Sequence, residues 1–193
     1  MKHIGILALL ICVPSLTGLG DDGIAKKSQT QDDFLFKKIG ENQVRVAGLI
    51  EKIPAAKVKL FFYSIDPNTP RDSKNKLTEP PKELFHEYPV LGFAEIVSMQ
   101  DKTNLLGTFA AGILENKTSS AWCFEPRHGI RIVSENATND FVICFECLQV
   151  YPYGFDSGHR FLTSGSPAAV FNSVLEKHHI KKAKERSQPR SNF

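Results

Sequence analysis

Two neighbouring strand-like segments constrain the fold of this chain more than any other feature. They are HGIRIV, residues 128–133, and DFVICFECLQVY, residues 140–151, and the linker between them is rich in Ser, Asn and Asp. Short linkers of this composition typically close a β-hairpin. Apolar residues occur at both alternating sets of positions in the second segment, which predicts a central strand that is covered on both faces. We therefore expect an antiparallel sheet with other elements packed on it.

Helices and further strands are predicted on either side of this hairpin. Apolar residues at helical spacing predict a helix over 44–53 that ends at Pro54, and an amphipathic helix over 101–114 with Asp101 as its N-cap. Alternating patterns predict strands over 57–62, 88–99 and 159–164, and a last helix that begins at Ser166 and Pro167. This order predicts one α+β domain, a mostly antiparallel sheet of about five strands with helices packed on it.

The N-terminal twenty residues have the pattern of an export signal. Lys2 and His3 precede an apolar run from Ile4 to Val13, and Pro14 and small residues follow. The run is far shorter than the roughly 20 residues that span a bilayer. We expect a signal peptide at 1–20, a polar leader at 21–42, the α+β domain at 43–178 and a basic flexible tail at 179–193. The mature protein would then be periplasmic or extracellular, without a transmembrane anchor.

The charge distribution argues against a nucleic-acid partner. The chain carries a formal net charge of +3, and residues 176–193 contain six Lys or Arg and only two Glu, so the whole surplus lies at one end. A nucleic-acid-binding domain usually shows its basic residues on the folded surface. A basic terminal segment is more often solvated and frayed.

Cysteine and histidine residues near the hairpin form a possible metal-ligand set. Cys123, His128, Cys144 and Cys147 read C-x4-H followed by C-x2-C, and thiolate and imidazole ligands suit Zn²⁺ or a copper ion. However, Cys144 and Cys147 are three residues apart, so on a regular strand their side chains face opposite sides of the sheet. A shared ion would require a bulge or a turn at this point.

The same thiols allow interpretations without a metal. A disulfide from Cys123 to Cys144 or Cys147 would be a structural cross-link. Removal of the expected signal peptide, which contains Cys12, leaves three cysteines, so one thiol would remain over. A redox-active pair of Cys144 and Cys147 would lack the helix N-terminus that lowers the thiol pKa in such pairs. A thiol-dependent enzyme would use Cys123 as nucleophile and His128 as base, which must then meet in space.

A buried acid is predicted beside these residues. If the hairpin turns near Asn136 to Ala137, His128 lies across from Glu146 or its neighbours, and Arg127 and Arg131 flank it. A buried carboxylate without a partner costs several kcal/mol. We therefore expect a structural polar cluster of Arg127, His128, Arg131 and Glu146, in which Glu146 pairs with Arg127 or Arg131.

The stretch also resembles a known group of proteins. The resemblance lies in CFxPRHGIR at 123–131 and in ICFEC at 143–147 with its flanking residues, and it extends from about Val58 to the last helix. These residues resemble an uncharacterised family of exported bacterial proteins, many of them from planctomycetes and related phyla. The resemblance implies an exported bacterial protein and supplies no reaction.

Taken with this resemblance, the sequence predicts an exported, non-enzymatic binding or structural module built around a cluster of Cys, His, Arg and Glu side chains. One alternative is a zinc- or copper-binding protein that uses Cys123, His128, Cys144 and Cys147. A third interpretation is a thiol-dependent enzyme. No cofactor is expected apart from the possible metal ion.

Overall fold

The computed structural model describes residues 40–69, 72–74, 76–78, 81–116, 120, 123–155 and 159–184. The expected signal peptide, nearly all of the expected leader and residues 185–193 of the expected tail lie outside these ranges. The described residues belong to one structural unit. None of the helices among them is both long enough and apolar enough to cross a membrane.

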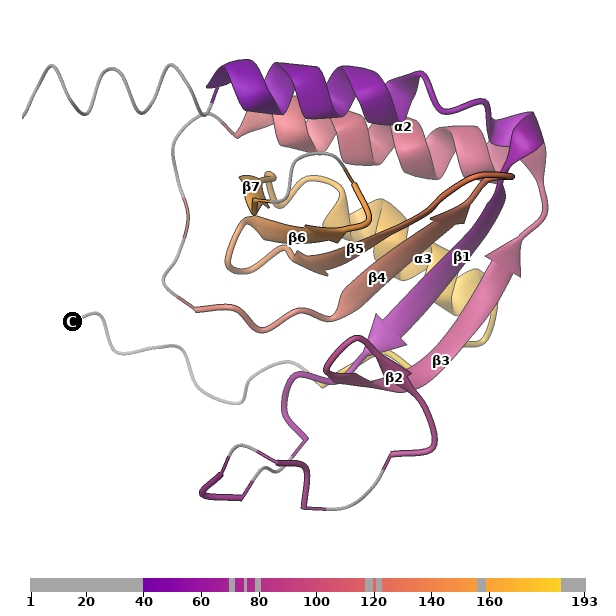
Figure 1. Ribbon diagram of the computed structural model, residues 1–193. Helices are drawn as coiled ribbons and strands as arrows, with labels where there is room; N and C mark the ends of the chain where they lie inside the picture. The colour runs from indigo at the N-terminus through magenta and orange to yellow at the C-terminus, as the bar shows by residue number, and fades with distance from the viewer. Residues whose placement is uncertain are drawn as a thin grey trace, which may run out of the picture. The chain divides into compact units, whose positions relative to one another are not determined.

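Within the described residues, seven antiparallel strands form one sheet in the order β2-β3-β1-β4-β5-β6-β7 (Figure 1). The α+β class and the antiparallel sheet are as expected, whereas the strand count is seven and not about five. The additional strands are β2, which has two residues, and β6, which the sequence analysis had merged with β5. The strands are β1 (Lys59–Ile65), β2 (Leu84–Phe85), β3 (Tyr88–Ile96), β4 (His128–Val133), β5 (Thr138–Cys144), β6 (Gln149–Tyr153) and β7 (Phe161–Leu162).

The expected long strand over 140–151 is in fact a hairpin. β5 ends at Cys144, residues 145–148 form a turn, and Gln149 of β6 pairs back with Cys144. The turn contains none of the Gly, Pro, Asn or Asp residues that usually mark such a reversal. It closes because the Cys147 N–H donates to Cys144 Sγ at 3.1 Å and Leu148 adopts a left-handed backbone conformation, with φ of 57°. The sulfur takes the acceptor role that side-chain oxygens commonly have in turns.

The helices pack on one face of the sheet. Figure 1 shows the helix at residues 40–51 and α2 running side by side, with α3 behind the strands. α2 begins one turn earlier than expected, because Ser98 is its N-cap and accepts the N–H of Asp101 at 3.3 Å. α3 begins at Ala168 with Pro167 as its N-cap, one residue later than expected. The helical segments are residues 40–51, the 3-10 turn η1 (Ala55–Lys57), α2 (Met99–Glu115) and α3 (Ala168–Lys177).

The larger core lies between these helices and the sheet. Its centre is aromatic: Phe62 of β1, Phe109 of α2, Phe141 of β5 and Phe171 of α3 are fully buried. The ring centroids of Phe62 and Phe171 are 5.2 Å apart and those of Phe109 and Phe141 are 5.4 Å apart, both edge to face. Such contacts are favourable beyond the area they bury. They fix α3 against β1, which positions the site described below.

A smaller core covers the opposite face of the sheet. Phe85 of β2 stacks on Tyr63 of β1, with centroids 4.3 Å apart, and packs in one cluster with Val142 of β5. Its ring also lies over Gly129 of β4, where a Cβ atom would come within 2.7 Å of the ring. β5 is therefore covered on both faces, as expected for a central strand, with Phe141 on the helix side and Val142 on the other.

The packed domain extends past the expected boundary at residue 178. Ile180 packs against the larger core, Ala183 is buried, and the Lys184 carbonyl accepts a hydrogen bond from Arg127 Nε at 3.2 Å. Residues 179–184 of the expected tail thus belong to the folded domain. They form one wall of the site.

Candidate functional site

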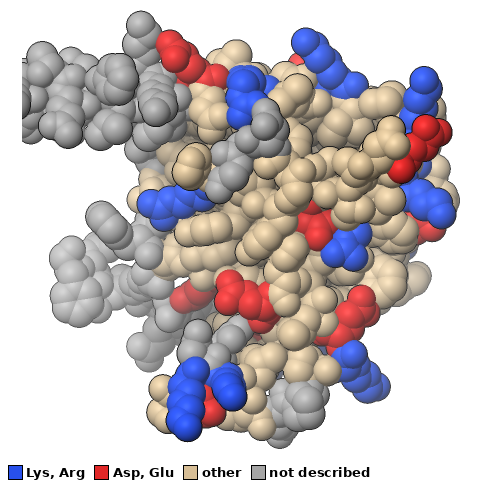
Figure 2. Space-filling view, viewed as in Figure 1, with Lys and Arg blue, Asp and Glu red and all other residues tan. Residues whose placement is uncertain are grey.

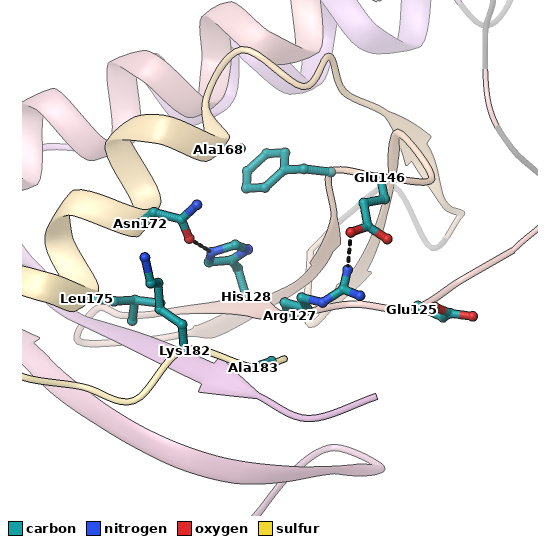
Figure 3. A pocket seen from close by; sticks show the side chains of 10 residues that line it. Glu125, Arg127, His128, Glu146, Ala168, Asn172, Leu175, Lys182 and Ala183 are labelled. Carbon is teal, nitrogen blue, oxygen red and sulfur yellow. Dashed lines mark hydrogen bonds and ion pairs between the residues drawn. The ribbon is translucent and has the colours of Figure 1, made fainter. Parts of the chain in front are cut away.

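A cavity of about 230 Å³ lies where β4 begins, between the β5–β6 turn, α3 and the C-terminal segment (Figure 3). Its polar lining includes Arg127, His128, Glu146, Asn172 and Lys182. Figure 3 shows Glu125 at the rim with its carboxylate pointing away from Arg127. The remaining lining residues are Phe145, Ala168, Leu175 and Ala183.

His128 forms the floor of this cavity. As the first residue of β4 it faces the helices, and it packs against Phe62, Phe145 and Phe171 with ring centroids 5.2–5.9 Å away. Its Nε2 lies 3.1 Å from Asn172 Oδ1, so Nε2 carries the proton and donates. Burial, together with the nearby cations Arg127 and Lys182, lowers the pKa of His128 to about 4, while the hydrogen bond to Asn172 acts in the opposite direction. The imidazole is therefore neutral near pH 7.

Arg127 has unused hydrogen-bonding capacity beside the cavity. Its side chain is 11% exposed, and its Nη1 pairs with Glu146 Oε1 at 2.7 Å. Its Nε donates to the carbonyl of Lys184. Its Nη2 is buried and has no hydrogen-bond partner among the described residues. A buried donor left without a partner costs about 1–3 kcal/mol, so an acceptor added next to this atom would stabilise the structure.

The structure divides the expected polar cluster between the two faces of the sheet. Arg127 and Glu146 are paired as expected, but Glu146 lies in the turn and is 51% exposed, so the acid is not buried. His128 pairs in register with Ile143 and not with Glu146. Arg131 is three residues from His128 and therefore points to the opposite face.

On that opposite face Arg131 pairs with an acid that the sequence analysis missed. Its Nε and Nη2 donate to the two carboxylate oxygens of Asp140 at 2.8 and 2.7 Å. Asp140 is buried and also contacts His86 Nε2 at 2.9 Å. The His86 ring stacks on Tyr153 with centroids 3.6 Å apart. The polar groups of this second network bond to one another, and the network packs over the smaller core.

The three cysteines meet at the β5–β6 turn. Cys123 Sγ lies 2.8 Å from Cys147 Sγ, and the Cys147 N–H donates to Cys144 Sγ. All three are thiols; Cys144 and Cys147 are buried, and Cys123 is partly exposed. We call this group the thiol cluster. The turn, which the sequence analysis did not predict, is what brings Cys144 and Cys147 to the same side.

The thiol cluster does not fit a metal ion as it stands. His128 faces the helices, whereas Cys144 lies on the other face of β5, so the set Cys123, His128, Cys144 and Cys147 is not assembled. Two thiolates on one Zn²⁺ ion, each about 2.3 Å from it, are about 3.8 Å apart. The 2.8 Å contact between Cys123 and Cys147 is much shorter. Throughout the described ranges, no group of three or more His, Cys, Asp or Glu side chains has a geometry that could hold a metal ion.

Two residues of this region had signals that sequence reasoning could have used. Asn172 is a polar residue on the inward side of a helix, next to buried Phe171 and one turn before buried Leu175. Asp140 lies directly opposite Arg131 in the hairpin register.

No family model, curated protein or solved structure matches this chain.

Proposed function

We propose that the domain is the non-enzymatic binding module of an exported bacterial protein, and that it binds a small anion, such as a carboxylate or phosphate, against Arg127. The observation that carries this proposal is the buried Nη2 of Arg127, which has no partner among the described residues and belongs to a side chain that lines the cavity. A guanidinium presents its N–H groups in a planar fork that suits carboxylate and phosphate oxygens. An anion seated there would supply the missing acceptor.

The other walls of the cavity suit the same ligand. Lys182 contributes a second cation, although its Nζ also contacts Glu176 at 2.7 Å. Glu146, the acid paired with Arg127, is half exposed and can turn toward water when a ligand takes its place. His128 is neutral and remains anchored to Asn172, so it shapes the floor without adding charge.

The size of the cavity limits the ligand. A water molecule occupies about 30 Å³ in the liquid, so a cavity of about 230 Å³ corresponds to roughly eight water-sized groups. Drug-sized ligands usually occupy about 300 Å³ or more. The cavity therefore suits an ion or a short organic acid better than a nucleotide or a peptide.

Binding is favoured over the other interpretations. A histidine whose pKa is about 4 is a weak general base near pH 7, which weighs against a thiol-dependent enzyme that uses Cys123 and His128. The zinc or copper alternative has less support because the thiols and His128 are separated by the sheet. Figure 2 shows Lys and Arg interspersed with Asp and Glu over the visible described surface, which favours a partner other than nucleic acid.

The test is anion-dependent stabilisation of the full chain. Acetate and inorganic phosphate are titrated against chloride at equal ionic strength, and thermal unfolding and calorimetry are recorded. A ligand at 100 times its Kd should stabilise the fold by about 2.7 kcal/mol. Arg127→Met should abolish the effect, while Lys177→Met, which removes a cation that pairs with Asp101 outside the cavity, should retain it. Equal stabilisation by chloride, or an unchanged response in Arg127→Met, would contradict the proposal.

A further inference from the structure

We propose that the thiol cluster is a thiol–disulfide exchange site, in which the sulfur of Cys147 is shared between two alternative disulfides, Cys123–Cys147 and Cys144–Cys147. Its substrates are disulfide-bearing oxidants of the glutathione class. The proposal goes beyond the anion cavity and does not depend on it.

The arrangement of the three sulfurs carries this inference. Cys147 Sγ is 2.8 Å from Cys123 Sγ on one side. On the other side its thiol hydrogen bonds with Cys144, whose Sγ also accepts the Cys147 N–H at 3.1 Å. Cys147 is therefore the central residue of the three, because its sulfur contacts that of Cys123 and its backbone N–H donates to the sulfur of Cys144. A thiolate attacks a disulfide at one of its sulfurs, and Cys144 lies beside the central residue of a Cys123–Cys147 bridge.

The backbone holds the thiols in this order. Cys144 ends β5 and pairs with Gln149, and the next pair along the ladder joins Ile143 to Val150. Only the turn residues 145–148 separate these two strands. Because Cys144 and Cys147 are attached to one short hairpin, their sulfurs remain adjacent whichever bridge is present.

The exposure of the three thiols determines which of them an external reagent reaches first. Cys144 is 1% exposed and Cys147 is fully buried, whereas Cys123 is partly exposed. An oxidant therefore reaches Cys123 first. The neighbouring sulfur then completes the exchange inside the protein.

The steps balance without a metal or a cofactor. The Cys123 thiolate attacks an external disulfide RSSR, forms the mixed disulfide and releases one thiolate RS⁻. The Cys147 thiolate attacks the Cys123 sulfur, releases the second RS⁻ and leaves the Cys123–Cys147 bridge. Two RSH have then been formed, and two protein thiols have been oxidised. The Cys144 thiolate attacks Cys147 next and releases Cys123, which takes up the proton that Cys144 has lost.

The electrostatics of the cluster suit the last of these steps, in which Cys144 attacks. In the step before it, Cys147 must first pass its proton to Cys144. The hydrogen bond from the Cys147 thiol and the backbone N–H groups of Glu125 and Cys147 lower the pKa of Cys144, against the effect of burial. The pKa of Cys147 is raised, because its thiol donates to Cys144 and because it is buried. A thiol with a lowered pKa supplies the attacking thiolate more readily.

The test maps the disulfides of the full chain. Every protein also carries Cys12→Ser, so that any internal disulfide that is detected comes from the thiol cluster. Protein is equilibrated with oxidised and reduced glutathione in the presence of a chelator, quenched in acid, alkylated and mapped by mass spectrometry. The protein with all three thiols should form one internal disulfide that always includes Cys147. Cys123→Ser should form Cys144–Cys147, and Cys144→Ser should form Cys123–Cys147. Cys147→Ser should form no internal bridge, and circular dichroism should show that it is folded.

Three outcomes would overturn the proposal. One is three alkylated thiols in the protein that retains the whole cluster, at a glutathione ratio that oxidises other buried dithiols. Another is a bridge between Cys123 and Cys144, which bypasses the central residue. The third is failure of either Cys123→Ser or Cys144→Ser to form its remaining bridge. None of these outcomes bears on anion binding at Arg127.

Discussion

Lowering the pH should destabilise the domain, and His128 should account for a distinct part of the loss. The ordinary pKa of a histidine is 6.5, and in the folded domain burial lowers the pKa of His128 to about 4. A tenfold change in an equilibrium corresponds to about 1.4 kcal/mol, so protonating His128 costs about 3.4 kcal/mol more in the folded protein than in the unfolded chain. This stability is fully present above pH 6.5 and is lost as the pH falls toward 4. At pH 4.5 about 2.5 kcal/mol should be gone.

The assay is urea unfolding of the wild type and His128→Gln at pH 7.5 and pH 4.5. Glutamine does not titrate in this range, and its amide can still face Asn172. The loss of unfolding free energy between the two pH values should therefore be about 2.5 kcal/mol larger in the wild type than in the variant, because all other groups cancel in the comparison. A difference below about 0.5 kcal/mol would refute the reasoning that His128 is buried in its neutral form.

Further substitutions test the packing of α2 and the pairing of Asp140. Gly107→Ala should stabilise the domain by about 0.5–1 kcal/mol, because nothing lies within 4 Å of the new Cβ and alanine favours the helix. Gly112→Ala should destabilise the domain by about 1–2 kcal/mol, because the new Cβ would lie 2.9 Å from Cδ of Pro167. Thermal unfolding should show shifts of opposite sign, and shifts of the same sign would contradict this. Asp140→Asn should cost about 2 kcal/mol, because it weakens both hydrogen bonds from the partly exposed Arg131. A double-mutant cycle with Arg131→Gln should show coupling, and strictly additive costs would argue against it.

The fold class could be predicted from the sequence because hydrophobic periodicity reports directly which face of each element is buried. The hairpin of β4 and β5, the amphipathic α2 and, to within one residue, the start of α3 all follow from such patterns. The β5–β6 turn could not be predicted in this way, because its reversal depends on the Cys144 sulfur as acceptor and on Leu148 in a conformation that leucine rarely adopts. The strand count was therefore wrong where local chemistry replaced the usual turn residues.

The candidate site was predicted in part, and a small error in the hairpin register explains much of the rest. Val133 pairs with Thr138, so the loop is centred before Asn136 and not after it. Moving the centre of a hairpin by about one residue moves every cross-strand pairing by about two. His128 consequently lies opposite Ile143, and Glu146 falls beyond the strand. The ion pair of Arg127 with Glu146 was still anticipated, because both residues remain near the mouth of the same hairpin.

Leu148 has a consequence for motion as well as for shape. A side chain other than glycine in the left-handed region costs about 1–2 kcal/mol, and this cost is recovered whenever the turn opens locally. The tip of the β5–β6 hairpin should therefore exchange its amide hydrogens with solvent well before the centre of the sheet does. Brief opening of this one corner would allow water and small reagents to reach two sulfurs that the static structure encloses.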